Sequence, residues 1–140
     1  MGAWGEKNFE SDSALDFFGD FCESNQDMVA LESAFENIIQ NDDYLDEDEC
    51  SAALVAGEII AYLMGNKSED FPSEEEYEPF LNVNLLKPQL NEAVIKKAIK
   101  AINKIKDSGD SELRELWEEA EDSYPIWQSV VEDLIQRLKK

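Results

Sequence analysis

The stretch from Ala52 to Met64 most limits what this chain can fold into. Only Gly57 and Glu58 interrupt its apolar side chains, so a helix formed here has no wide polar side to turn towards solvent. A helix that is apolar on nearly all sides is stable only where other elements cover it. We therefore expect a central, buried helix over residues 46–64.

The residues at both ends of this segment support that prediction. Asp46 is the expected N-cap, and Glu49 three positions later completes the pattern of a capping box. The acidic residues at 46–49 also lie where the helix dipole favours negative charge. Gly65 is the expected stop, because glycine adopts the left-handed conformation that ends many helices.

Apolar residues at helical spacing also occur on both sides of this segment. The predicted helices cover residues 12–24, 27–40, 88–106, 113–120 and 125–138. A short helix capped by Ser73 is expected in the proline-punctuated segment 66–87, and the rest of that segment is expected to be loop. No stretch alternates apolar and polar residues as a half-buried strand would. The prediction is a single all-α domain over residues 1–140, a bundle of six to seven helices.

Charge excludes whole classes of partner. The 140 residues contain 33 acidic and 12 basic side chains and no histidine, a formal net charge of −21. A surface of this sign repels phosphate backbones and anionic lipids, so neither nucleic acid nor membrane is an expected partner. The charge is also uneven, since residues 1–86 hold 22 acids and two lysines, whereas residues 87–106 hold six lysines and one acid. Lysines 96, 97, 100 and 104 are expected to form an exposed band that offsets the acids of neighbouring helices.

The sequence contains no recognisable set of catalytic or metal-binding residues. The acids between Asp42 and Glu49 do not match a calcium loop in either possible frame, because the glycine and the alternating ligands are missing. Two cysteines without histidine cannot complete a zinc site. Glycine-rich phosphate-binding and nucleophile-elbow motifs are absent as well. We predict no metal, no cofactor and no enzymatic activity.

Targeting signals and cysteine usage indicate a cytoplasmic protein. The longest apolar run, residues 59–64, has six residues where a membrane span needs about 20, and no basic segment precedes an apolar one near Met1. Cys22 and Cys50 are expected to be buried free thiols instead of a disulfide.

Three tryptophans and one arginine have expected positions. Trp117 and Trp127 lie on apolar helical stripes and are expected in the core. Trp4, between glycines, is expected to anchor the N-terminal end into the core. Arg137 is expected to meet the negative end of the last helix's dipole, as are the two C-terminal lysines.

Several short motifs occur along most of the chain. They are Met1–Gly5 with Phe9 and Glu10, Ala14–Phe17, Tyr44–Asp46, Ala52–Glu58, Ser111–Glu119, Trp127 and Arg137-Leu138. On these motifs the chain resembles a bacterial family of small acidic proteins of unknown function that begin Met-Gly-Ala-Trp-Gly. The resemblance implies a bacterial source and a single intact domain, and it brings no catalytic residues with it.

Two functions are compatible with this sequence. The favoured one is an immunity or inhibitor protein that neutralises a basic partner, such as a secreted nuclease toxin, by filling its electropositive cleft. The alternative is a structural or regulatory interaction domain whose charge serves solubility. The acids least explained by helix capping are the predicted partner-binding residues: Asp42, Asp43, Glu69, Asp70, Glu74 and Glu75. The sequence indicates no oligomeric state.

Overall fold

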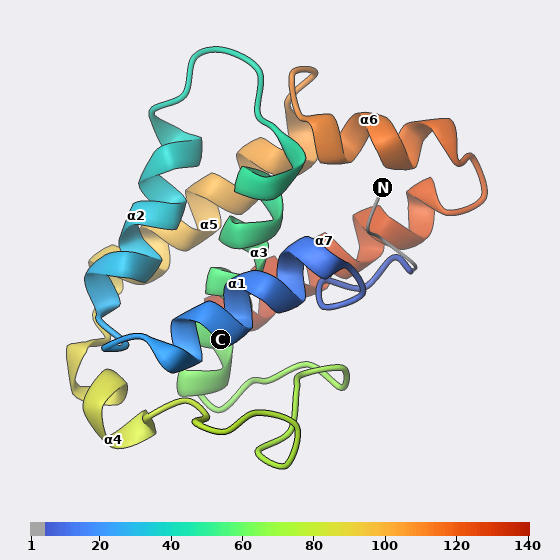
Figure 1. Cartoon of the computed structure of the whole chain (residues 1–140). Coiled ribbons are helices and arrows are strands. Elements are labelled where there is room, and N and C mark those ends of the chain that lie inside the picture. The colour runs from blue at the N-terminus through green and yellow to red at the C-terminus, as the bar shows by residue number, and fades with distance from the viewer. Residues whose placement is uncertain (1–4) are drawn as a thin grey trace.

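The computed structural model describes residues 5–140, and these residues form an all-α domain (Figure 1). The helices are α1 (Asp12–Glu23), α2 (Met28–Ile39), α3 (Glu47–Leu63), α4 (Val83–Leu86), the 3-10 helix η1 (Lys87–Gln89), α5 (Glu92–Asp107), α6 (Glu112–Glu119) and α7 (Tyr124–Lys139). The structure is 65% helical, and the described residues contain no strand. The predicted fold class is therefore confirmed.

The central helix is α3, as its sequence predicts. Twelve of its 17 residues are buried, and it packs against α1, α2, α5, α6 and α7. Gly57 allows the closest of these contacts: a Cβ atom there would lie 2.6 Å from Ile102 Cδ1 and 3.3 Å from Leu134 Cδ2. The missing side chain thus lets α5 and α7 approach the middle of α3.

The predicted ends of α3 are also confirmed. Asp46 Oδ1 accepts a hydrogen bond of 2.8 Å from the backbone N–H of Glu49. At the other end Gly65 has φ of 87°, in the left-handed region that glycine adopts without strain. The start of α3 is tied to the start of α6 by an isolated parallel bridge between Leu45 and Ser111. Two distant helix starts are therefore fixed side by side.

Three predictions for residues 66–106 are wrong. Ser73 begins a turn and not a helix: the Glu76 carboxylate accepts hydrogen bonds from the backbone N–H and the hydroxyl of Ser73, as at a helix start, but Pro79 follows too soon for a helix to continue. The helix expected from residue 88 begins at Glu92, where the Asn91 side chain caps it by accepting from Val94 N–H at 3.0 Å. Residues 83–89, expected to be loop up to residue 87, form α4 and η1 instead.

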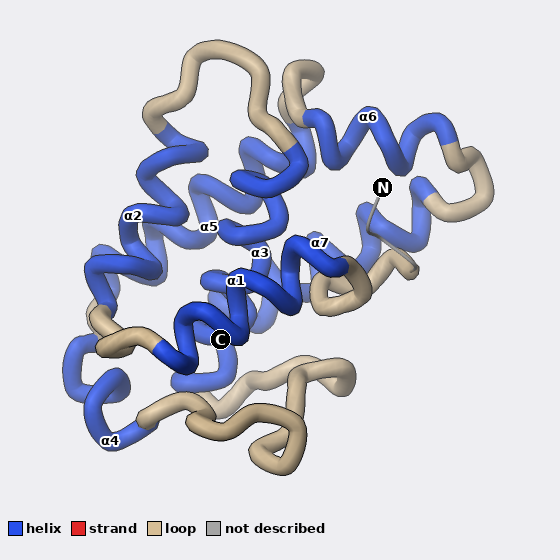
Figure 2. The backbone as a smooth tube through the Cα atoms, in the orientation of Figure 1, coloured by secondary structure: helices blue, strands red, loops and turns tan. Residues whose placement is uncertain are grey.

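The segment 66–82 has little regular structure, but it is packed against the helices (Figure 2). Its aromatic side chains form edge-to-face or stacked pairs with rings of α1 and α3: Phe71, Tyr77 and Phe80 contact Phe18, and Phe71 stacks on Tyr62. Gln26, with φ of 50°, holds the end of the segment by donating to Phe80 O and accepting from Asn82 N–H. The loop is thus part of the folded core.

The buried aromatic and sulfur side chains lie where expected. Trp117 and Trp127 are buried, and both cysteines are buried free thiols. Burial raises the pKa of Cys22 and of Cys50 to about 11, so neither is a reactive thiolate near neutral pH. Trp4 lies outside the described residues. Among those residues, no helix combines the length and the apolar character that crossing a membrane requires.

Candidate functional site

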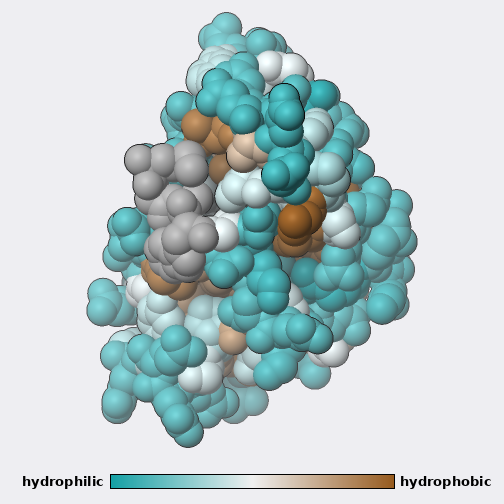
Figure 3. All heavy atoms as spheres, turned by 90° about the vertical axis from the view of Figure 1, so that its right-hand side faces the viewer, coloured by the Kyte–Doolittle hydropathy of each residue, from teal (hydrophilic) through white to brown (hydrophobic). Residues whose placement is uncertain are grey.

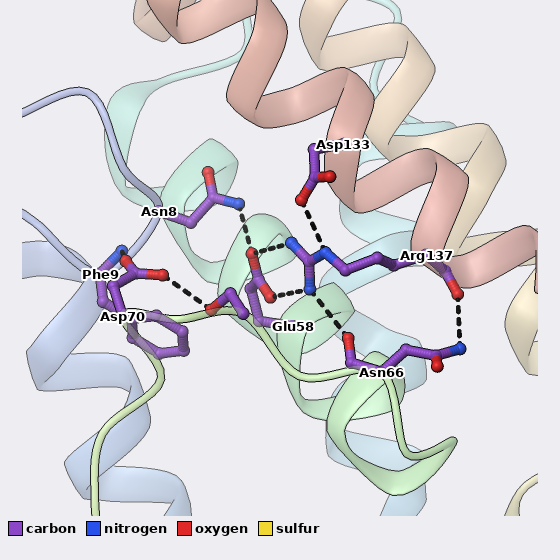
Figure 4. Close-up of polar contacts among 8 residues, drawn as sticks. Asn8, Phe9, Glu58, Asn66, Asp70, Asp133 and Arg137 are labelled. Atoms are coloured by element: carbon purple, nitrogen blue, oxygen red, sulfur yellow. Dashed lines mark hydrogen bonds and ion pairs between the residues drawn. The ribbon is translucent and has the colours of Figure 1, made fainter.

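A buried ion pair joins the central helix to the last one. Glu58 is the single charged residue in the apolar part of α3, and 1% of its surface is exposed. Its carboxylate accepts two hydrogen bonds from the Arg137 guanidinium of α7, Nη1 to Oε1 at 2.8 Å and Nη2 to Oε2 at 3.0 Å (Figure 4). The two parallel bonds satisfy a charge that would otherwise be costly to bury.

Neighbouring polar groups complete this pair. Asn8 donates to Glu58 Oε2 at 2.7 Å, Asp133 accepts from Arg137 Nε at 2.8 Å, and the Asn66 carbonyl accepts from Arg137 Nη1 at 3.1 Å. Burial acts to lower the pKa of Arg137, but the carboxylates of Glu58 and Asp133 raise it above its ordinary value. The guanidinium is therefore charged, and its hydrogen bonds link α7 to α3 and to the Asn66 carbonyl.

Sequence reasoning missed this network. The sequence predicts that Arg137 meets the negative end of the dipole of the last helix, whereas its side chain turns into the core towards Glu58. The available signal was Glu58 itself, because a charge on a helix without a solvent side needs a partner of opposite sign. The sequence could not identify that partner, since the two residues are 79 positions apart.

A cleft of about 460 Å³ opens beside the ion pair. It is lined by Lys7, Glu58, Lys67, Ser68, Glu69, Asp70, Ser129, Val130, Asp133 and Arg137. Its volume is that of a small-molecule pocket, but such pockets are mostly apolar, and here Val130 is the one apolar side chain among charged and hydroxyl groups. The cleft contains the only two lysines of residues 1–86, so opposite charges balance closely within it.

The structure does not bring the predicted partner-binding acids together. Asp42 and Asp43 are exposed on the α2–α3 loop, at the opposite end of the molecule from the 66–82 segment (Figure 1). Tyr44 fixes that loop by donating to Glu115 Oε2 at 2.8 Å, and this hydrogen bond is the main cause that raises the pKa of Tyr44 to about 12.

The other four predicted acids divide between two places. Glu69 and Asp70 line the cleft, and Asp70 has a structural role because it accepts from Phe9 N–H at 3.3 Å and from Ser68 Oγ at 2.7 Å. Glu74 and Glu75 are exposed in the turn that begins at Ser73. Glu74 and Glu75 are therefore the two that lie together on an open surface of this segment.

The turn with Glu74 and Glu75 extends an acidic stripe of α1. The stripe consists of four exposed residues that recur every three or four positions, Asp12, Asp16, Asp20 and Glu23. Tyr77 connects the two elements, since its ring lies 4.9 Å from that of Phe18 and 3.5 Å from where a Cβ of Gly19 would be. We call this surface the acidic face: Asp12, Asp16, Asp20 and Glu23 of α1 with Glu74, Glu75, Glu76 and Glu78 of the segment.

The surroundings of the Tyr77 side chain show that α1 and the turn with Glu74 and Glu75 lie close together. The pKa of Tyr77 is raised first by burial and then by the charges of Glu76, Cys22 and Asp16. One acid of the segment and one of α1 therefore act on the same phenol. No lysine or arginine occurs between Lys7 and Lys67, so α1, α2 and α3 supply no positive charge of their own.

The lysines of α5 are largely engaged inside the molecule. Lys97 pairs with Glu32 and Glu36 of α2 at 3.0 and 2.9 Å, which raises its pKa. Lys104 donates to three carbonyls at the end of α2, those of residues 38, 39 and 41, and Lys106 pairs with Glu132 of α7. The predicted band is therefore not uniformly exposed: Lys96 and Lys100 face solvent, while Lys97 and Lys104 bind α2.

The described residues contain no cluster of three or more potential metal ligands of the Cys, Asp or Glu type. Comparison with known proteins gives one match, to a family described as "Domain of unknown function (DUF4259)", over residues 2–130. No curated protein and no solved structure matches this chain.

Proposed function

The chain belongs to the DUF4259 family, and we propose that it is an acidic binding protein whose partner is a basic protein. The acidic face supports this proposal most directly. Its eight carboxylates lie on two adjoining elements, residues 12–23 and 74–78, that themselves contain no basic residue, while lysines 97, 104 and 106 are held by other helices. A surface of uncompensated charge attracts an oppositely charged partner from a distance.

A second face of the molecule is hydrophilic as well. On the side that carries the α6–α7 turn, hydrophilic residues cover most of the surface and hydrophobic ones form small, separate patches (Figure 3). The described residues on this side of the molecule therefore form no broad apolar surface for an interface. Recognition by charge fits such a surface better than burial of a large hydrophobic area.

The more specific proposal is that the protein is a bacterial, cytoplasmic immunity protein that neutralises a nuclease toxin. A nuclease cleft is electropositive because it binds phosphates, and an acidic protein seated on it excludes the nucleic acid. The Tyr77 ring packs against Phe18 and so holds the two elements of the acidic face together. The role requires no catalytic residue in this chain.

The direct test is inhibition of the nuclease encoded beside the gene for this chain. Cleavage of a fluorescent oligonucleotide should stop when the protein is added at an equimolar amount. The Glu74→Gln, Glu75→Gln double variant should associate more slowly than wild type at about 0.05 M salt and equally fast near 0.5 M, where the Debye length is a few Å.

A matched control removes the same charge elsewhere. Glu121 and Asp122 are exposed in the α6–α7 turn, so Glu121→Gln with Asp122→Asn should change the association rate much less. Equal effects of the two double variants would mean that net charge and not the acidic face guides binding. Failure of the wild-type protein to bind or inhibit any nuclease encoded next to its gene would refute the immunity proposal.

A further inference from the structure

A groove lies between α1 and α2, next to the acidic face. These two helices each pack on α3 and not closely on one another, which leaves a hollow of about 270 Å³ over the beginning of α3. Phe17 of α1, Ala30 and Ala34 of α2 and Ala52 of α3 contribute its apolar lining. Small side chains of α2 and α3 thus leave room beside Phe17 where larger ones would have filled it.

The rim of this groove is acidic at one end. Asp48 and Glu49, in the first turn of α3, both line it. Asp48 is held in place because its Oδ1 accepts from Ser13 Oγ of α1 at 2.8 Å. The pKa of Glu49 is raised, first by burial and then by Asp46, so a nearby positive charge would relieve an unfavourable environment.

The size and chemistry of the groove indicate which kind of side chain fits it. The volume is smaller than the roughly 300–1,000 Å³ of typical small-molecule sites. An apolar floor that ends at two carboxylates matches a long basic side chain, whose methylene stem packs on apolar surface while its charged end stays polar. Val29, beside Ala30 on α2, is 61% exposed and adds apolar surface close by.

We infer that this groove is the docking position of an amphipathic basic helix of the partner, with a lysine or arginine stem over Ala30 and Ala52 and its cation at Asp48 and Glu49. Charge complementarity supports this occupant, since residues 8–66 contain 15 acids and no base. The inference rests on the proposed function, because it gives the basic partner a specific place of contact.

Two synthetic peptides of equal length and charge test it. One places leucine and lysine at helical spacing, and the other replaces each leucine by serine. By calorimetry at about 0.05 M salt, the leucine–lysine peptide should bind wild type about tenfold more tightly, because its leucines add apolar area against Phe17 and Ala34 beside the lysine stem that both peptides share. Amide NMR shifts should concentrate at residues 30, 34 and 52.

Two variants localise the site. Ala30 is exposed, so Ala30→Trp should fill the groove without disturbing the core. This variant should bind both peptides equally well, without the tenfold difference in affinity. The control Ala93→Trp, at an exposed alanine of α5, should keep that difference. Asp48→Asn keeps a hydrogen-bond acceptor for Ser13, and it should weaken the binding of both peptides more than Asp122→Asn does.

Equal affinity of the two peptides, or an Ala30→Trp variant that behaves as wild type, would overturn the inference. Nuclease inhibition is measured separately, so the outcomes stay distinct. If the Ala30→Trp variant inhibits the nuclease as well as wild type does, the proposed function stands and the docking position in the groove is refuted. If the protein binds the peptide in the groove but inhibits no nuclease, the docking position stands and the immunity proposal is refuted.

Discussion

Glu58 of α3 and Arg137 of α7 form a two-bonded ion pair whose side chains are 1% and 10% exposed. We expect Arg137→Met to destabilise the protein by about 3–5 kcal/mol, because it leaves a buried carboxylate with only Asn8 as a partner. The Glu58→Met, Arg137→Met double variant should recover most of that loss. Urea unfolding of the three variants measures this, with Lys139→Met on the exposed side of α7 as the control. A cost below about 1 kcal/mol for Arg137→Met would contradict the assigned role.

A second prediction concerns the centre of α3. Ile60 is fully buried, so Ile60→Asp places an unpaired carboxylate in the core at a cost of several kcal/mol, comparable with the whole stability of such a domain. The variant should lose its cooperative thermal transition in circular dichroism. Ile126→Asp, at a side chain that is 51% exposed, should melt close to wild type. Similar melting of both variants would argue against the central position of α3.

The outcome for α3 illustrates what the sequence can predict. Its apolar circumference, the Asp46 cap and Gly65 are local features, and local features sufficed to place it and its ends correctly. The Ser73 turn was mispredicted because Ser73 and Glu76 form the hydrogen bond of a helix start, whereas Pro79 prevents the next residues from continuing as a helix.

Contacts between distant segments explain the other omissions. The Glu58–Arg137 pair, the engagement of Lys104 with the end of α2, and the groove between α1 and α2 each depend on how helices pack. No local pattern encodes those distances. For the same reason the sequence grouped Asp42 with Glu74, although the fold places them at opposite ends.

The third prediction is a dependence of stability on pH. The pKa of Glu47 is raised from its ordinary value of 4.5 by burial and then by the charges of Glu112 and Asp48. A raised pKa means that the folded state holds this proton more tightly than the unfolded state, so the contribution of Glu47 is lost as pH rises above 4.5. Glu47→Gln should therefore raise the melting temperature at pH 7 and change it little near pH 3.

Glu132 serves as a control because its pKa is shifted in the opposite direction. Its pKa is lowered by hydrogen bonds from Gln136 and Lys106, so its contribution is present at neutral pH and lost on acidification. Glu132→Gln should lower the melting temperature at pH 7 and have little effect near pH 3. If both variants shifted the melting temperature in the same direction at pH 7, the assignment of these two environments would be wrong.

The fourth prediction concerns salt. With a net charge of −21 and most acids exposed, repulsion among carboxylates outweighs the few ion pairs, of which only Glu58–Arg137 is deeply buried. Screening should therefore raise the thermal midpoint between roughly 0.01 M and 0.5 M sodium chloride. A clear fall would show that the partly exposed pairs, chiefly those of Lys97 with α2, contribute more than repulsion removes.

The absence of basic residues between Lys7 and Lys67 also decides how the protein can be tethered and labelled. Reagents that couple to lysine amines will attach at Lys7, at Lys67 or beyond, and leave every side chain of α1, α2 and α3 unmodified. A sensor surface prepared through lysines would leave the carboxylates of the acidic face and of the groove unmodified. Carbodiimide activation of carboxylates would do the reverse, consuming the groups that the proposed partner has to meet.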